Sequence, residues 1–211
     1  MIPINALLGA YAQGLFPMAV EGRTMWFSPE RRGILPLDGL HVPRRLGRVL
    51  RQARFRTTVD QAFPAVIEAC AARPDGGETW IDAGLIESYT ALHAAGYAHS
   101  LEVWRGERLA GGLYGVSLRG AFFGESMFHT VSDASKVALC RLVEWLRQRG
   151  YRLLDLQWLT PHLATFGAVE VSRREYLALL AAALEVDCRF DDPLRRSAPA
   201  EAAGDVTARE G

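Results

Sequence analysis

Apolar and polar residues alternate in the middle of the chain in a pattern that predicts antiparallel strands. Leu101-Glu102-Val103-Trp104 is the first run, and residues 108–118 and 121–124 follow it. The turns between them contain glycine, at 105–107 and 119–120, and short glycine turns between apolar runs are typical of β-hairpins. We therefore expect a meander of three strands.

Beyond the meander, the apolar residues take on helical spacing. Ser132 or Asp133 can cap the start of a helix and Gly150 can end it. A strand over 151–157 follows, and then a last helix that opens with the capping box Ser172-Arg173-Arg174-Glu175. The apolar stripe of the first helix consists of Leu139, Leu142, Val143 and Leu146. Strands followed by helix, strand and helix predict an α+β fold with an acyltransferase-like core.

The first part of the chain is less regular. Residues 25–27 predict a short strand that ends before a proline, and helices are expected over 43–54, 60–72 and 83–95. We therefore divide the chain into an N-terminal mixed domain (1–95), a C-terminal domain (96–190) and a tail (191–211). The tail is rich in Ala, Pro, Gly and charged residues, which predicts disorder.

Composition narrows the class of protein. The 211 residues include 24 basic and 24 acidic side chains, so the overall charge gives no sign of a nucleic-acid partner. Three cysteines without a C-x-x-C pair, and five scattered histidines, predict neither a disulfide framework nor a metal site. Residues 1–20 have no basic leader and no long apolar run. We expect a cytoplasmic protein that needs no cofactor.

One basic segment stands out against this neutral background. Between Arg44 and Arg56 the chain has six arginines and no acid. On a helix, Arg44, Arg48 and Arg51 share one face. Such a row is either a solvated helix face or a site for RNA phosphates, and Arg31 and Arg32 could extend it.

Three sets of polar or aromatic side chains have both a structural and a functional interpretation. Trp26 and Trp104 either pack in the core or stack on a nucleobase. Asp155 and Gln157 lie two apart in the predicted strand and so project to the same face. They form either a buried hydrogen-bonded pair or a group that handles an amine. Glu125, in an apolar run, is either a satisfied buried acid or the site of an ammonium group.

A series of ordered segments is similar to one known family. They are Tyr11-x-x-Gly14-x-Phe16-Pro17-Met18, Trp26-x-Ser28-Pro29-x-Arg31, Thr79-Trp80-Ile81, Leu92-His93-x-x-Gly96-x-Ala98-His99-Ser100-x-Glu102-Val103-Trp104, Gly111 to Val116, Gly124 to Phe128 with Ala134-Ser135-Lys136, and Leu154-Asp155-x-Gln157 followed by His162 and Gly167-Ala168. Together they cover about residues 5 to 180. The chain thus resembles the bacterial leucyl/phenylalanyl-tRNA-protein transferases.

This resemblance implies an enzyme that moves Leu or Phe, and less well Met, from aminoacyl-tRNA to the N-terminal Arg or Lys of acceptor proteins. The product is marked for degradation by the bacterial N-end rule pathway. The resemblance also implies a small N-terminal domain joined to a GNAT-like acyltransferase domain. The tRNA ester is already activated, so we expect positioning and proton removal to be the remaining tasks, carried out by a monomer away from membranes.

The resemblance also suggests roles for individual residues. Asp155 would polarise and fix Gln157, Gln157 would engage the acceptor amine, and Glu125 would help to hold it. Trp26 and Trp104 would bracket the terminal adenosine. The pocket for the amino-acid side chain would be walled by Leu113, Met127, Leu142 and Leu146, and tRNA phosphates would meet Arg44, Arg45, Arg48 and Arg51.

Two other function classes stay open at this point. An acetyl-CoA-dependent N-acetyltransferase would share the C-terminal fold, but it needs a glycine-rich pyrophosphate loop at a helix start. The segment before the predicted helix, residues 129–134, has no glycine. A non-enzymatic RNA-binding module would explain the arginines and tryptophans but would leave Asp155, Gln157 and Glu125 without a task.

Overall fold

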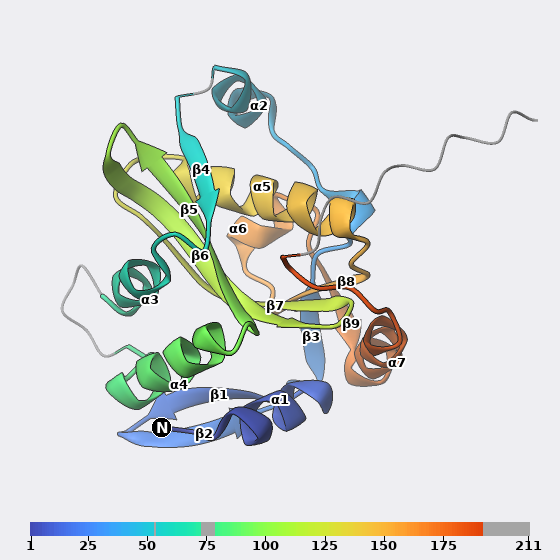
Figure 1. Cartoon of the computed structure of the whole chain (residues 1–211). Helices are drawn as coiled ribbons and strands as arrows, with labels where there is room; N and C mark the ends of the chain where they lie inside the picture. The colour runs from blue at the N-terminus through green and yellow to red at the C-terminus, as the bar shows by residue number, and fades with distance from the viewer. Residues whose placement is uncertain (53, 73–78, 192–211) are drawn as a thin grey trace, which may run out of the picture.

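The structure is a computed structural model that describes residues 1–52, 54–72 and 79–191. Residues 192–211 of the predicted tail lie outside the described residues. The main feature is a seven-stranded sheet in the order β4-β5-β6-β7-β8-β3-β9 (Figure 1). Its strands are β3 (Arg31–Ile34), β4 (Arg56–Val59), β5 (Ala98–Arg105), β6 (Arg108–Leu118), β7 (Ala121–His129), β8 (Leu153–Gln157) and β9 (Val169–Ser172). A separate hairpin pairs β1 (Phe16–Val20) with β2 (Arg23–Phe27).

The predicted meander is confirmed, because β5, β6 and β7 pair antiparallel in chain order. β7 then pairs with β8 in parallel, and the crossover between them is helix α5. Gly115 lies beside an irregularity of the β6–β7 pairing, and a Cβ there would lie 2.2 Å from the Phe123 carbonyl oxygen. A glycine is therefore needed where these two strands approach each other.

β3 joins distant parts of the chain. It lies between β8 and β9 and pairs antiparallel with both. β3 and β4 both precede residue 95, so the main sheet crosses the predicted division between an N-terminal and a C-terminal domain. The fold is a mixed α/β structure in which the early strands complete the sheet of the later ones. The division at residue 95 stays a prediction.

Helices cover both faces of the sheet. The helices are α1 (Ile4–Ala12), α2 (Arg44–Arg51), α3 (Phe63–Ala71), α4 (Ala83–Ala94), α5 (Ala134–Arg149), α6 (Pro161–Ala164) and α7 (Arg173–Leu184), with a short 3-10 turn at Leu37–Gly39. On one face the sheet packs against α5, through residues such as Leu139 and Leu142. On the other it packs against α1, α3, α4 and α7, through residues such as Tyr11 and Tyr89.

The predicted helix ends are partly right. α5 ends at Gly150, which has a φ of 82°, and α7 opens with the capping box of Ser172 and Glu175. Asp133 stands at the start of α5, but its side chain binds Lys136 and caps no backbone N–H. Within the described ranges, no helix combines the length and apolarity needed to cross a membrane.

Candidate active site

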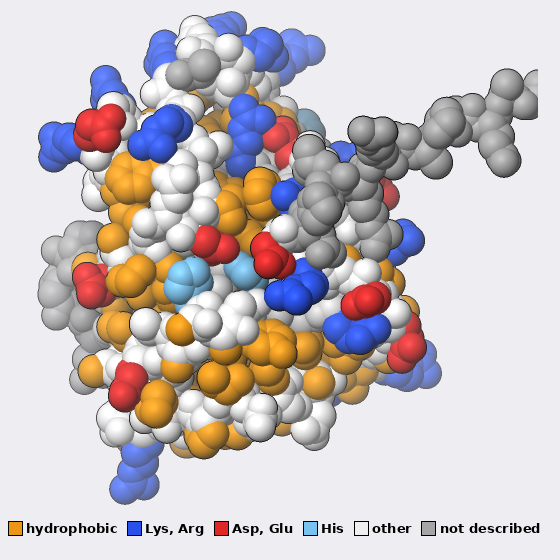
Figure 2. Space-filling view, viewed as in Figure 1, with side chains coloured by type: hydrophobic (Ala, Val, Ile, Leu, Met, Phe, Trp, Pro, Cys, Tyr) orange, Lys and Arg blue, Asp and Glu red, His pale blue; other side chains and the backbone are white. Residues whose placement is uncertain are grey.

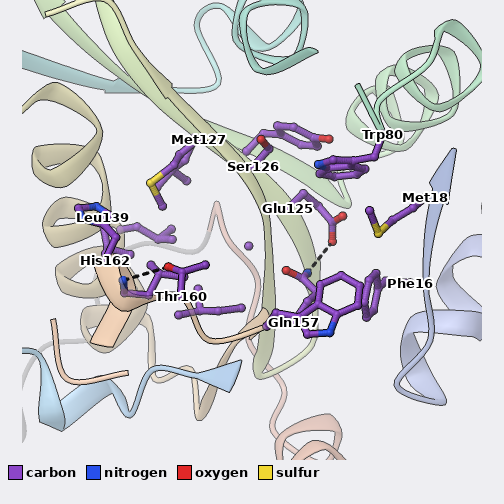
Figure 3. A pocket seen from close by; sticks show the side chains of 17 residues that line it. Phe16, Met18, Trp80, Glu125, Ser126, Met127, Leu139, Gln157, Thr160 and His162 are labelled. Atoms are coloured by element: carbon purple, nitrogen blue, oxygen red, sulfur yellow. Dashed lines mark hydrogen bonds between the residues drawn. The ribbon is translucent and has the colours of Figure 1, made fainter. Parts of the chain in front are cut away.

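A cavity of about 380 Å³ opens between the N-terminal hairpin, strands β6 to β8 and helices α5 and α6 (Figure 3). Most of its wall is apolar, and Glu125 and Gln157 are side by side within it. Its lining consists of Phe16, Met18, Trp80, Leu113, Tyr114, Gly124, Glu125, Ser126, Met127, Leu139, Leu142, Leu156, Gln157, Trp158, Thr160, His162 and Leu163. An apolar cavity with a few convergent polar groups is what a small-molecule site needs.

The four predicted pocket residues divide into two groups. Leu113, Met127 and Leu142 line the cavity. Leu146 does not line it, because it is fully buried in the core between α5 and the sheet, one helical turn beyond Leu142. The role of Leu146 in the pocket stays a prediction, since a shared helix face does not fix how far along the helix a cavity extends.

Asp155 is held by a buried cation. The guanidinium of Arg32 donates two hydrogen bonds to it, from Nε to Oδ1 at 2.9 Å and from Nη2 to Oδ2 at 2.6 Å. The Tyr176 hydroxyl donates a third to Oδ2 at 2.8 Å. Arg32 and Asp155 are 1% and 0% exposed in their side chains. Two charges buried this deeply need a two-point geometry of this kind.

Asp155 also fixes the turn that carries Gln157. The backbone N–H of Gln157 donates to Asp155 Oδ1 at 2.9 Å. Gln157 has a φ of 58°, a left-handed conformation that costs a residue other than glycine about 1–3 kcal/mol. The backbone that follows Gln157 packs closely against Gly33, because a Cβ at Gly33 would lie 2.7 Å from the Trp158 carbonyl carbon. Asp155 thus positions Gln157 through its backbone rather than through its side-chain amide.

Glu125 projects from β7 into a set of neutral partners. The Tyr11 hydroxyl, from α1, donates to Oε1 at 2.7 Å, and the Tyr89 hydroxyl, from α4, donates to Oε2 at 3.0 Å. Gln157 Nε2 donates to Oε1 at 3.2 Å. Burial raises the pKa of Glu125 to about 7, although the two tyrosine hydrogen bonds lower it. Glu125 can therefore gain or lose a proton near neutral pH.

The two predicted tryptophans do not form a pair in this structure. Trp26 lies on the β1–β2 hairpin, and Trp104 lies near the end of β5 in the other sheet. The Trp104 indole donates to Thr58 Oγ1 at 2.7 Å, and the Arg56 guanidinium lies over its ring. Neither tryptophan lines the cavity. This cavity therefore does not contain the predicted bracket around an adenosine, and the role of the two tryptophans stays a prediction.

Sequence reasoning missed the aromatic residues that do line the cavity. Trp80 and Trp158 both contribute to its wall, and the Phe16 ring meets the Trp158 indole edge-on at 4.9 Å. Trp80 stands in a short segment between two helices, where no periodicity marks it. Its place in the Thr79-Trp80-Ile81 segment of the resemblance was the one signal that could have singled it out.

The arginines separate into an exposed group and a buried one. Arg44, Arg45, Arg48 and Arg51 are all exposed on α2, while Leu46 of the same helix is buried. Figure 2 shows basic side chains gathered at the end of the molecule where α2 lies. Arg32 is buried against Asp155, so its predicted contribution to a phosphate site is wrong. The spacing of arginines along the sequence does not show that one of them pairs with an aspartate 123 residues later.

Histidines and other possible metal ligands can be placed in the structure. Among the described residues, no group of three or more His, Cys, Asp or Glu side chains is arranged to hold a metal ion. His162, which follows Gln157 in the segments of the resemblance, lies in the cavity wall (Figure 3). Loss of solvation there lowers its pKa.

Comparison with known proteins gives one consistent result. A family model described as leucyl/phenylalanyl-tRNA protein transferase matches residues 34–181, and a model of the N-terminal domain of that transferase matches residues 2–30. Among curated proteins, leucyl/phenylalanyl-tRNA--protein transferases are similar over most of their length. One from Synechocystis sp. is 50% identical and covers 90% of this chain and 95% of the relative. Others come from Phenylobacterium zucineum (54% identical, 87% and 85% covered) and Nitrobacter winogradskyi (53%, 92% and 88%). The chain belongs to the leucyl/phenylalanyl-tRNA protein transferase family and is an aminoacyltransferase.

Proposed function

We propose that this chain transfers Leu or Phe, and less well Met, from aminoacyl-tRNA to the N-terminal Arg or Lys of acceptor proteins, as a monomer in the cytoplasmic N-end rule pathway. The family supplies the reaction class. The observation that carries the assignment to this site is the apolar cavity in which Glu125 and Gln157 are hydrogen-bonded to each other. An apolar side chain and a reacting amine would find their partners within one cavity.

The donor amino acid would place its side chain among Leu113, Met127 and Leu142. These residues offer no hydrogen-bonding group, so they favour Leu, Phe and Met over polar amino acids. Met127 is unbranched and adapts to different shapes, which suits a pocket that accepts both an aliphatic and an aromatic guest. One methylene more or less would change binding by about 1–3 kcal/mol.

The acceptor amine would bind between Gln157 and Glu125. Because Gln157 donates its Nε2 to Glu125, its Oε1 is the amide atom that can accept a hydrogen bond from the amine. An ionised Glu125 would hold the acceptor as an ammonium group, which gives one proton to the solvent before it reacts. The neutral amine nitrogen then attacks the ester carbonyl carbon, and the 3′-oxygen of the tRNA ribose leaves with the second proton of the amine. Asp155 supports this step by fixing the Gln157 backbone.

The rest of the tRNA would contact two other surfaces. Arg44, Arg45, Arg48 and Arg51 would meet phosphates and give affinity without reading the base sequence. The terminal adenosine would stack on an aromatic ring of the cavity wall, for which Trp80 is available. This is an alternative to the predicted pair of Trp26 and Trp104.

A direct assay tests the reaction. The protein is mixed with labelled Phe-tRNA and an Arg-initiated peptide, with acetyl-CoA as the alternative donor. We expect labelled Phe on the peptide and no acetylation. Acetylation without Phe transfer would assign the chain to the N-acetyltransferases, and tRNA binding without any transfer would leave only an RNA-binding module.

Substitutions of Leu142 and Leu146, which lie one helical turn apart, test which residues form the pocket for the donor side chain. Leu142→Ala enlarges the cavity and should shift the donor preference from Leu toward Phe. Leu146→Ala is the matched control, since it should cost about 2–5 kcal/mol of stability and leave the preference unchanged. The Leu/Phe selectivity ratio of each folded variant checks this, and a shift in Leu146→Ala alone would reverse the assignment.

A further inference from the structure

Glu125, Tyr11 and Tyr89 form a triangle of short oxygen contacts. The Tyr11 hydroxyl is 2.7 Å from Glu125 Oε1, the Tyr89 hydroxyl is 3.0 Å from Oε2, and the two hydroxyls are 2.6 Å apart. Both tyrosines are fully buried. Each of the three contacts is short enough to require a hydrogen between its oxygens.

Counting hydrogens shows that an ionised Glu125 does not satisfy this triangle. Two tyrosine hydroxyls have two hydrogens in total. If both hydroxyls donate to the carboxylate, the Tyr11–Tyr89 contact has none, and two oxygen lone pairs face each other at 2.6 Å. One more hydrogen is needed, and the carboxyl group is the member of the triangle that can bind it.

A protonated Glu125 closes the ring. Its Oε2–H donates to Tyr89, the Tyr89 O–H donates to Tyr11, and the Tyr11 O–H donates to Oε1. Every contact then has one hydrogen, and Gln157 Nε2 still donates to Oε1. The ring favours the neutral acid, whereas each tyrosine taken alone favours the anion, because a hydrogen bond to a charged acceptor is about twice as strong.

We propose that Tyr11 and Tyr89 are positioning residues that turn Glu125 into the proton acceptor of the transfer reaction, by closing a three-membered hydrogen-bond ring when it is protonated. This rests on the proposed function. As the acceptor nitrogen bonds to the ester carbonyl carbon, its proton passes to Glu125 and the ring closes. The carbon–oxygen bond to the tRNA then breaks, and the ribose 3′-oxygen takes the proton, which opens the ring again.

Other groups around Glu125 do not replace this ring. Tyr114 of β6 packs edge-on to the Tyr89 ring at 5.4 Å, but among the described residues its hydroxyl has no hydrogen-bond partner. Arg32 and Asp155 act on Glu125 through charge alone, and in opposite directions, since Arg32 lowers its pKa and Asp155 raises it. The Arg32 guanidinium is committed to Asp155.

Infrared spectroscopy tests the ring without any assay of transfer. The wild-type spectrum minus that of Glu125→Gln should contain the carbonyl band of a protonated carboxylic acid, which disappears as the pH rises through about 7. The glutamine can donate to Tyr89 and accept from Tyr11, so it keeps the ring but has no proton to lose. Absence of the band at every pH above 5 would overturn the proposal.

A double-mutant cycle then tests the contact between the two hydroxyls. If the tyrosines acted independently, the shifts of the Glu125 midpoint in Tyr11→Phe and Tyr89→Phe would add in the double variant. The ring predicts an upward shift in the double variant that exceeds the sum of the single shifts, because either single change already removes the opposed lone pairs and breaks the ring. Additive shifts would contradict the ring. Tyr114→Phe, the matched control, should leave the midpoint unchanged.

The role in the reaction has its own readout. In single-turnover transfer to an Arg-initiated peptide, the rate should rise with pH, and its midpoint should move with the infrared midpoint across the tyrosine variants. Glu125→Gln should be about 100-fold slower while its affinity for Phe-tRNA is unchanged. Rate profiles that do not follow the infrared midpoints would overturn the role of Glu125 as acceptor. Failure of the wild type to transfer Phe would instead overturn the proposed function, and the infrared result would stand apart.

Discussion

Asp155 lies close enough to Glu125 to raise its pKa, yet the hydrogen-bond donors around the two carboxylates differ in charge. Asp155 meets the full positive charge of Arg32, and three of its hydrogen bonds come from Arg32 and Tyr176. Among the described residues, the hydrogen bonds to Glu125 come from two hydroxyls and an amide, all of them neutral. Neutral donors do not offset burial, so the pKa of Glu125 rises to about 7. Asp155 is therefore suited to stabilise the local structure, and Glu125 is suited to exchange a proton.

Removing the cation should have the largest effect. Arg32→Met leaves Asp155 buried and without the guanidinium, which should lower the free energy of unfolding by about 3–5 kcal/mol. Arg31→Met is the adjacent control, because Arg31 pairs with Glu170 at the surface and should cost less than about 1 kcal/mol. Urea unfolding measures both. Equal losses would mean that the buried pair contributes no more than the surface pair.

The pH dependence of stability sharpens the other half of the comparison. Folded Glu125 keeps its proton up to about pH 7, whereas the unfolded side chain loses it near its ordinary value of 4.5. The folded state therefore binds more protons between these values, and stability falls as the pH rises through them, by about 3 kcal/mol at most. Glu125→Gln should lack this part of the fall. Parallel stability curves from pH 4.5 to 7.5 would show that Glu125 is ionised throughout.

Kinetics can separate positioning from chemistry at Asp155 and Gln157. Gln157→Ala should lower kcat about 100-fold and leave the KM for the donor nearly unchanged, because its contact is with the attacking amine. Asp155→Asn should act in the same direction by loosening the Gln157 backbone. The double variant should be scarcely slower than the slower single one. Unchanged turnover in both single variants, with folding checked by circular dichroism, would remove these residues from the mechanism.

The arginines of α2 should show the smallest effect on stability. Changing Arg44, Arg48 and Arg51 to Ala should alter the free energy of unfolding by less than about 0.5 kcal/mol each, since they are exposed. The three changes should weaken tRNA binding and flatten its salt dependence, by about 0.9 in slope for each phosphate that is no longer neutralised. Transfer from a minimal aminoacyl-adenosine should be unaffected. An equal decrease in transfer with both donors would contradict phosphate binding.

Local patterns predicted much of the fold. The β5–β7 meander, the end of α5 at Gly150 and the capping box of α7 all follow from neighbouring residues. β3 carries no such signal. It is four residues long and pairs with strands more than 120 residues later, so only the folded chain brings it into the sheet.

For the candidate site, the sequence likewise predicted the central residues but not their long-range partners. Asp155, Gln157 and Glu125 stood out as polar residues in apolar runs, and the structure brings them to one place. The partners that give them different properties did not stand out. Arg32 appeared as one of many arginines, Tyr11 appeared only within a segment of the family resemblance, and Tyr89 was not singled out. What a carboxylate does depends on contacts that sequence spacing does not contain.

The position of β3 has a consequence for the order of events during synthesis. Arg32 leaves the ribosome 123 residues before Asp155. At about 5–20 residues per second, it waits on the order of 6–25 s for its counter-charge. Until then Arg32 has no carboxylate to pair with, and burying its charge alone would be costly. We therefore expect the meander and α5 to assemble while β3 is still in water. The site around Gln157 is therefore completed late. A nascent chain that stops short of β8 lacks the strand that joins β7 to β3 in the sheet.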